Sequence, residues 1–143
     1  MKAHAGLRER AVRHVHTLGM GFSDFAVLEV LLHKGPLPVN TIGCLVRLTS
    51  GSITAAVDRL VVKGLVERCS HATDRRARVV HLTESGRALI TAAFADHAAA
   101  MEQAAAGLTM EERAQLAALL KKLGRFTVAM GGPVIASEDE SVC

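Results

Sequence analysis

The segment running from residue 39 to residue 87 restricts the fold more than any other part of the 143-residue chain. Between Ile53 and Val61 apolar residues recur every three or four positions, which is the spacing of a helix that packs on one side. Thr49 or Ser50 can accept a backbone N–H at the start of this helix, and Gly64 can adopt the left-handed conformation that closes its end. The segment therefore predicts a helix, a tight turn, a second helix and a two-stranded hairpin.

The other face of the second helix carries small, neutral side chains at its N-terminal end, and several of them bear hydroxyl groups. A helix end with nothing bulky on it can approach a phosphate or the floor of a DNA groove closely. The residues of this helix that we expect to face a nucleic acid are Thr49, Ser50, Gly51, Ser52, Thr54, Ala55 and Arg59.

Two β-prone segments follow, residues 65–68 and 78–82, with a polar loop between them. Arginines at the tip of a hairpin suit insertion into a narrow and strongly negative minor groove. Asp74 can hold the guanidinium of Arg76 in a bidentate pair and so lower the entropy lost on binding. The wing residues that we expect to contact DNA are Asp74, Arg75, Arg76 and Arg78.

The charge of the chain is distributed by segment. The net charge is +3, yet residues 39–87 hold eight Lys and Arg against four Asp and Glu, while residues 88–143 hold four against seven. A basic segment between less basic ones is the electrostatic pattern of a protein that binds the phosphate backbone. Double-stranded DNA is the partner that this distribution favours.

Helices are predicted on both sides of the central segment. Residues 2–18 form a short first helix, and Ser23 caps a second helix that is apolar nearly all round and is expected to be buried. A long helix from residue 84 to about residue 106 has apolar residues at alternating spacings of four and three, a seam suited to packing on another long helix. Thr109 to Glu112 is a capping box that opens a last helix. Its side chains expected to face inward are Leu116, Leu119, Leu120, Leu123 and Phe126.

Two motifs resemble those of the MarR family of bacterial transcription regulators. One is the helix pattern of residues 57–68, and the other is the wing, from Asp74-Arg75-Arg76 into residues 82–87. The resemblance implies a dimeric DNA-binding repressor or activator whose affinity changes with a small ligand or with thiol oxidation. It further implies that Arg76 is the minor-groove arginine with Asp74 as its brace. Ser50, Ser52 and Thr54 would face the major groove, and Ala55 stands where many family members have arginine.

The expected fold is therefore mainly α with a small β-hairpin wing: a winged helix-turn-helix with N- and C-terminal dimerisation helices. Residues 1–20 would form the N-terminal dimerisation helix, 22–87 the DNA-binding domain, 88–130 the C-terminal dimerisation helices and 131–143 a tail. A small core cannot cover the apolar faces of the terminal helices, so we expect a homodimer. A two-fold dimer places its recognition helices about 34 Å apart.

Other function classes find less support. No nucleophile motif, phosphate loop or paired-carboxylate site stands out, so we expect no enzyme and no cofactor. No metal-binding spacing occurs in the sequence. Cys69 and His71 are two positions apart, but no further ligand accompanies them. No apolar run reaches the roughly 18 residues of a membrane span, no signal peptide is evident, and three cysteines fit a reducing cytoplasm.

Two residues are candidates for regulation, and one alternative function stays open. Cys69 opens the wing next to Arg68, where positive charge favours a reactive thiol, so it is the candidate redox site. His97 lies on the apolar seam and is the candidate polar contact of a small-molecule effector pocket. The alternative function is a winged-helix module that binds proteins and not DNA. The arginines of the wing favour the regulator, because a protein-binding wing has no need of them.

Overall fold

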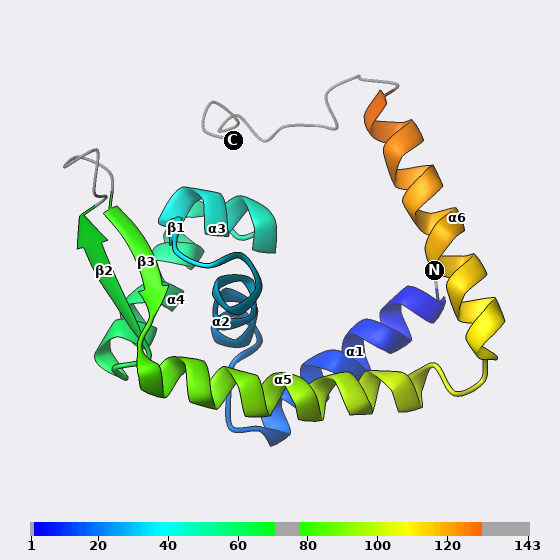
Figure 1. Cartoon of the computed structure of the whole chain (residues 1–143), viewed down its shortest axis with the longest axis horizontal. Coiled ribbons are helices and arrows are strands. Elements are labelled where there is room, and N and C mark those ends of the chain that lie inside the picture. The colour runs from blue at the N-terminus through cyan, green and yellow to red at the C-terminus, as the bar shows by residue number, and fades with distance from the viewer. Residues whose placement is uncertain (1, 71–77, 130–143) are drawn as a thin grey trace.

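The computed structural model describes residues 2–70 and 78–129. Its helices and strands follow the predicted order, and Figure 1 shows the long helix α5 running from the sheet at one end of the molecule to α6 at the other. The mainly α architecture with a small β-wing is therefore confirmed. The elements are α1 (Lys2–Thr17), α2 (Phe22–Lys34), β1 (Leu37–Pro38), α3 (Val39–Val46), α4 (Ser50–Val62), β2 (Val66–Ser70), β3 (Arg78–Leu82), α5 (Glu84–Ala104) and α6 (Met110–Ala129).

The sheet has three antiparallel strands in the order β1-β3-β2, one more than the sequence predicted. The extra strand is β1, in which Leu37 pairs with Val80 and Pro38 with Val79. Proline has no N–H to give to a ladder, so it is tolerated only at an edge, and β1 is an edge strand. A two-residue strand after Gly35-Pro36 has too little pattern of its own to be recognised from sequence.

Helix α2 lies at the centre of the core, as its nearly uniform apolar composition predicted. Its buried side chains pack with those of α4, of the sheet and of α5. In α4 the predicted stripe points into this core at Ile53, Ala56, Val57 and Leu60, although Val61 at its edge is 38% exposed. The largest fully buried side chains are Phe25, Leu28, Leu31, Ile42, Leu60, Ile90, Val15, Val27, Val57, Val66 and Val80.

Both predicted ends of α4 are confirmed. Thr49 is the N-cap, and its hydroxyl accepts the backbone N–H of Ser52 at 3.3 Å. Gly64 has a φ of +67°, which lets the N–H of Leu65 donate to the carbonyl of Leu60 at 2.9 Å. The position and orientation of α4 are thus specified locally at each end.

The predicted cap of α2 is wrong. The helix begins at Phe22 after an extended Gly21, and no side chain caps it. The hydroxyl of Ser23 instead accepts a hydrogen bond from the guanidinium of Arg59 on α4. A tertiary donor therefore replaces the local backbone N–H that the sequence pattern suggested.

A close backbone contact joins the end of α4 to the start of α5. A Cβ at Gly86 would lie 1.9 Å from the carbonyl oxygen of Leu65, so only glycine fits there. Thr83 caps α5 as predicted, accepting from the N–H of Gly86 and donating to the carbonyl of Gly64. The wing thus leads into α5 through a fixed corner.

Helix α6 departs most from expectation. The side chains predicted to face inward are 46–64% exposed, and α6 packs extensively against none of the other described elements. Figure 1 shows it leaving the end of α5 at a steep angle. The apolar face of α6, defined as Leu116, Leu119, Leu120, Leu123 and Phe126, is uncovered in the single chain.

Within the described residues no single helix is long and apolar enough to cross a membrane. Only α1 and α2 taken together meet that length and composition, and they are bent by 90° relative to each other.

Candidate nucleic-acid interface

The N-terminal end of α4 is exposed and carries small, uncharged side chains. Ser50, Gly51, Ser52, Thr54 and Ala55 all lie on the surface, where the sequence placed them. The first turn of α4 holds no acidic residue, so the positive end of the helix dipole is not neutralised by its own side chains. This arrangement suits close approach of a phosphate or a groove edge.

Local hydrogen bonds determine whether each hydroxyl of this surface can donate or accept a further hydrogen bond. Thr54 Oγ1 donates to the carbonyl of Ser50 at 2.8 Å, which leaves its lone pairs to accept. Thr49 Oγ1 donates to Ser52 Oγ at 2.9 Å, which leaves the hydroxyl proton of Ser52 to donate elsewhere. Thr54 is thus an acceptor, suited to an amino group of adenine or cytosine, and Ser52 is a donor.

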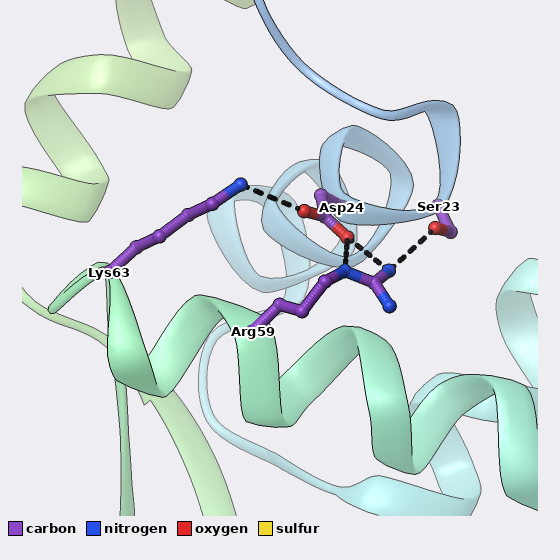
Figure 2. Close-up of polar contacts among 4 residues, drawn as sticks. All are labelled: Ser23, Asp24, Arg59 and Lys63. Carbon is purple, nitrogen blue, oxygen red and sulfur yellow. Dashed lines mark hydrogen bonds and ion pairs between the residues drawn. The ribbon is translucent and has the colours of Figure 1, made fainter.

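Arg59, one of the residues expected to face DNA, contacts the start of α2. Figure 2 shows its guanidinium lying over the start of α2, where Nε and Nη2 donate to Asp24 Oδ1 at 3.2 and 2.6 Å. Nη2 also donates to Ser23 Oγ at 3.2 Å. Two guanidinium nitrogens of Arg59 therefore bind α2 and link it to α4, while the side chain stays 50% exposed.

Asp24 is the centre of this cluster. Its side chain is only 4% exposed, and its second oxygen, Oδ2, accepts from Lys63 Nζ at 3.2 Å. The hydrogen bond from Arg59 to Asp24, together with the nearby negative charge, raises the pKa of Arg59. A buried carboxylate needs such partners, and here they come from α4 and from its C-cap Lys63, so the cluster fixes α4 to α2.

A further ion pair connects α4 to the wing. Arg68 on β2 contacts Asp58 on α4, with Nη1 and Oδ1 2.6 Å apart, and the Arg68 side chain is 28% exposed. Arg78 is the first residue of β3 and pairs with Ser70 at the end of the ladder. The predicted wing contacts Asp74, Arg75 and Arg76 lie outside the described residues.

His97, the candidate effector contact, lies where α5 meets α1 and α2. Its Nδ1 is 3.2 Å from Nδ1 of His14, and its ring stands edge-on to Phe25 with centroids 5.0 Å apart. Burial, and to a lesser extent the neighbouring His14, lower the pKa of His97. Burial thus favours the neutral imidazole of His97, and in the contact with His14 one ring nitrogen can donate while the other accepts.

Cys69, the candidate redox residue, is exposed on β2 and carries a free thiol. Its Sγ lies 3.0 Å from Nε2 of His81 on the neighbouring strand. The sequence predicted no metal site at this cysteine, because the only nearby ligand along the chain was His71. Strand pairing instead brings His81 and Glu67 to Cys69, with their donor atoms all within 4.8 Å of one another.

Sequence reasoning missed several functional positions for one reason. Asp24, Lys63, Arg68 and His14 each act through a residue on another element, and no local pattern marks such a partner. One signal was present for Asp24, which is the only acidic residue in the first turn of a largely apolar helix. A buried carboxylate of this kind requires a cationic partner.

Comparison with known proteins agrees with this geometry. A family model described as MarR family matches residues 18–77. The HTH-type transcriptional regulator MhqR of Bacillus subtilis is 38% identical over 123 residues, which cover 86% of this chain and 85% of that protein.

Solved structures match over most of the chain as well. A MarR variant from E. coli complexed with operator DNA is 26% identical, with a TM-score of 0.73 over 85% of this chain and 88% of the other. A Mycobacterium tuberculosis MarR family protein in complex with p-aminosalicylic acid is 25% identical, with a TM-score of 0.72 over 86% and 93% of the chains.

These relatives favour a DNA-binding function over the alternative of a module that binds only proteins, and they are regulators, not enzymes. With its exposed α4, its wing and a regulator matched along 86% of its length, the chain belongs to the MarR family of DNA-binding transcriptional regulators.

Proposed function

We propose that this regulator binds DNA as a homodimeric repressor, with the N-terminal end of α4 in the major groove and the wing in the adjacent minor groove. The observation that carries the proposal is the exposed, acid-free first turn of α4, held on α2 by the Asp24–Arg59 pair. In the major groove the exposed residues of this helix end would face the bases and phosphates: Thr49, Ser50, Gly51, Ser52, Thr54 and Ala55. In the minor groove Arg75, Arg76 and Arg78 would contact DNA with Asp74 as a brace.

The uncovered apolar face of α6 supports the homodimer. Five large apolar side chains at helical spacing lie on the surface of α6, and a monomeric protein rarely leaves such a continuous patch in water. A second copy of the chain would cover it, with residues 1–20 and 88–130 as the dimerisation region around a DNA-binding domain of residues 22–87. Two recognition helices would then lie about one DNA turn apart on a palindromic site.

Release from DNA would follow from a small ligand or from oxidation of Cys69. The relative bound to p-aminosalicylic acid makes a small aromatic acid a suitable first probe of the region around His97. An effector shifts the dimer away from the DNA-binding arrangement only by as much as it prefers the other arrangement. Because its target is the chromosome, we propose that the protein acts in the cytoplasm.

The test is a binding experiment on selected DNA. Random duplexes enriched on the full-length protein give a preferred site, and fluorescence anisotropy then measures affinity for that site and for a scrambled one across a salt series. We expect Arg76→Ala to weaken both and to reduce the salt slope by about one. Arg125→Ala, on the far helix α6, is the matched control and leaves the slope unchanged.

Thr54→Val separates recognition from simple charge attraction. It keeps the size of the side chain and removes the accepting hydroxyl, so it should weaken the preferred site more than the scrambled site. Equal loss on both duplexes would remove Thr54 from the readout. If the wild-type protein showed no salt-dependent binding to any duplex, the proposed DNA contacts would be wrong.

A further inference from the structure

The outer face of the β2–β3 hairpin carries three side chains of the kinds that bind metal ions. Glu67 is directly opposite His81 in the antiparallel register, and Cys69 follows Glu67 by two positions on β2. Residues two apart on a strand point to the same face, so all three side chains leave the hairpin on one side. The other face carries Val66, Val80 and Leu82, which enter the core.

The three donor atoms are close enough to share one ion. Sγ of Cys69 is 3.0 Å from Nε2 of His81, and Nε2 is 3.8 Å from a carboxylate oxygen of Glu67. An ion with bonds of about 2.0–2.3 Å to nitrogen, oxygen and sulfur holds such atoms roughly 3 to 4 Å apart. Glu67 and Cys69 are exposed and His81 is partly so, so an ion can reach them from solvent.

The orientation of the His81 ring is an independent observation that points to a ligand. Its Nδ1 lies 3.3 Å from the carbonyl oxygen of Leu82. A carbonyl can only accept, so the proton of the neutral ring belongs on Nδ1, and the lone pair of Nε2 points toward Cys69. Metal-binding histidines are held in this way, with the second ring nitrogen donating to a backbone carbonyl or a carboxylate.

We propose that Glu67, Cys69 and His81 form a binding site for a divalent transition-metal ion, with Zn²⁺ as the preferred ion and water as the fourth ligand. Thiolate, imidazole and carboxylate together suit zinc and exclude calcium and magnesium, which take oxygen ligands. When the ion binds, the thiol proton of Cys69 passes to solvent and an S–Zn bond replaces the S–H bond.

The bound ion would join β2 to β3 near the end of the hairpin ladder. The ladder ends at Ser70 and Arg78, close to Cys69 along the chain, so the ion would lie next to the segment that carries the wing arginines. The site goes beyond the proposed DNA contacts, and its occupancy does not depend on them.

Cobalt titration of the reduced full-length protein tests the proposal. Co²⁺ replaces zinc in such sites, and a cysteine thiolate bound to it gives an intense charge-transfer band in the near ultraviolet. We expect the wild-type protein to show this band with one equivalent of Co²⁺. Subsequent addition of Zn²⁺ should displace the cobalt and abolish the band. Cys69→Ser should lack the band, while the control Cys44→Ser, on α3, should keep it.

The two other ligands are tested by affinity. Loss of an outer partner of a metal ligand costs about 10- to 100-fold in affinity, so loss of a ligand itself should cost at least that much. Competition against a zinc chelator should therefore show weaker binding in His81→Gln and Glu67→Gln, and no change in His16→Gln, an exposed histidine of α1. A cobalt band that persists in Cys69→Ser, or no band in the wild-type protein, would overturn the site.

Discussion

Asp24 and Arg59, 35 positions apart in the chain, form the shortest polar link between α2 and α4, with Nη2 and Oδ1 2.6 Å apart. Asp24 is buried while Arg59 is half exposed, so the carboxylate depends on the guanidinium more than the reverse. Arg59 lies in the C-terminal half of α4, so the contact with Asp24 leaves the N-terminal end of the helix exposed. This partly buried pair thus holds α4 on α2 and leaves the proposed recognition surface uncovered.

A double-mutant cycle should reveal this dependence. Arg59→Ala leaves the Asp24 carboxylate buried with Lys63 as its remaining cation, so it should lower the denaturation midpoint clearly. In the Arg59→Ala background, Asp24→Ala should lower the free energy of unfolding by less than it does in the wild-type protein. The reason is that it then removes a carboxylate that has already lost its guanidinium partner. Chemical denaturation measures both effects, and the exposed Arg13–Glu9 pair serves as the control cycle, with coupling near zero. Strictly additive losses for Asp24 and Arg59 would contradict the assignment.

Gly51→Ala separates DNA approach from folding. A Cβ at Gly51 meets nothing within 4 Å, so the substitution should leave the fold intact and stabilise it by up to about 1 kcal/mol. If the start of α4 lies close to a phosphate, the added methyl group should nevertheless weaken DNA binding. Anisotropy and thermal unfolding on the same preparation measure the two effects. Gly6→Ala on α1, also in open space, should affect stability alone. Unchanged affinity in Gly51→Ala would place the DNA farther from α4.

Charge on the apolar face of α6 should dissociate the proposed homodimer. Leu120→Asp introduces a carboxylate into the face that a second copy would bury, where an unpaired charge is costly. Sedimentation should show a dimer for the wild-type protein and a monomer for the variant, with DNA affinity falling in parallel. Ala118→Asp places the same charge on the opposite side of the helix and should remain dimeric. A Leu120→Asp dimer as tight as wild type would require another interface.

Stability should fall on acidification because of His97. The folded chain lowers the pKa of His97 through burial and through His14, so the unfolded chain takes up the proton first. The unfolded state then binds more protons, and stability is complete above the ordinary histidine pKa of about 6.5 and falls as pH decreases below it. Melting temperatures between pH 7.5 and 5 should show a shallower decline in His97→Gln than in the wild-type protein. His16→Gln should follow the wild type, and equal slopes in both variants would exclude His97 as the cause.

Local patterns predicted a large part of this fold and of the candidate site. The apolar stripe of α4, its Thr49 cap, the glycine at its end and the bounds of β3 all follow from neighbours within one or two helical turns or along one strand. The exposed residues of the α4 N-terminus follow from the same periodicity, since the face opposite a buried stripe must lie at the surface.

The failures come from interactions between distant segments. Ser23 was expected to cap α2, yet its hydroxyl accepts a hydrogen bond from Arg59. The apolar side chains of α6 were expected inside, yet they lie on the surface of the single chain. A periodic apolar face shows that a surface will be covered. It does not show whether the same chain or another one covers it.

The sequence by itself determined the helices, the hairpin and the mild, hydroxyl-bearing surface of α4, because these depend on backbone preferences and on short-range periodicity. Only the tertiary structure decided that Asp24 holds Arg59, that His14 meets His97 and that Glu67, Cys69 and His81 share one face of the wing. These contacts join residues up to 83 positions apart. They depend on the packing of whole elements and on strand register, which no short stretch of sequence encodes.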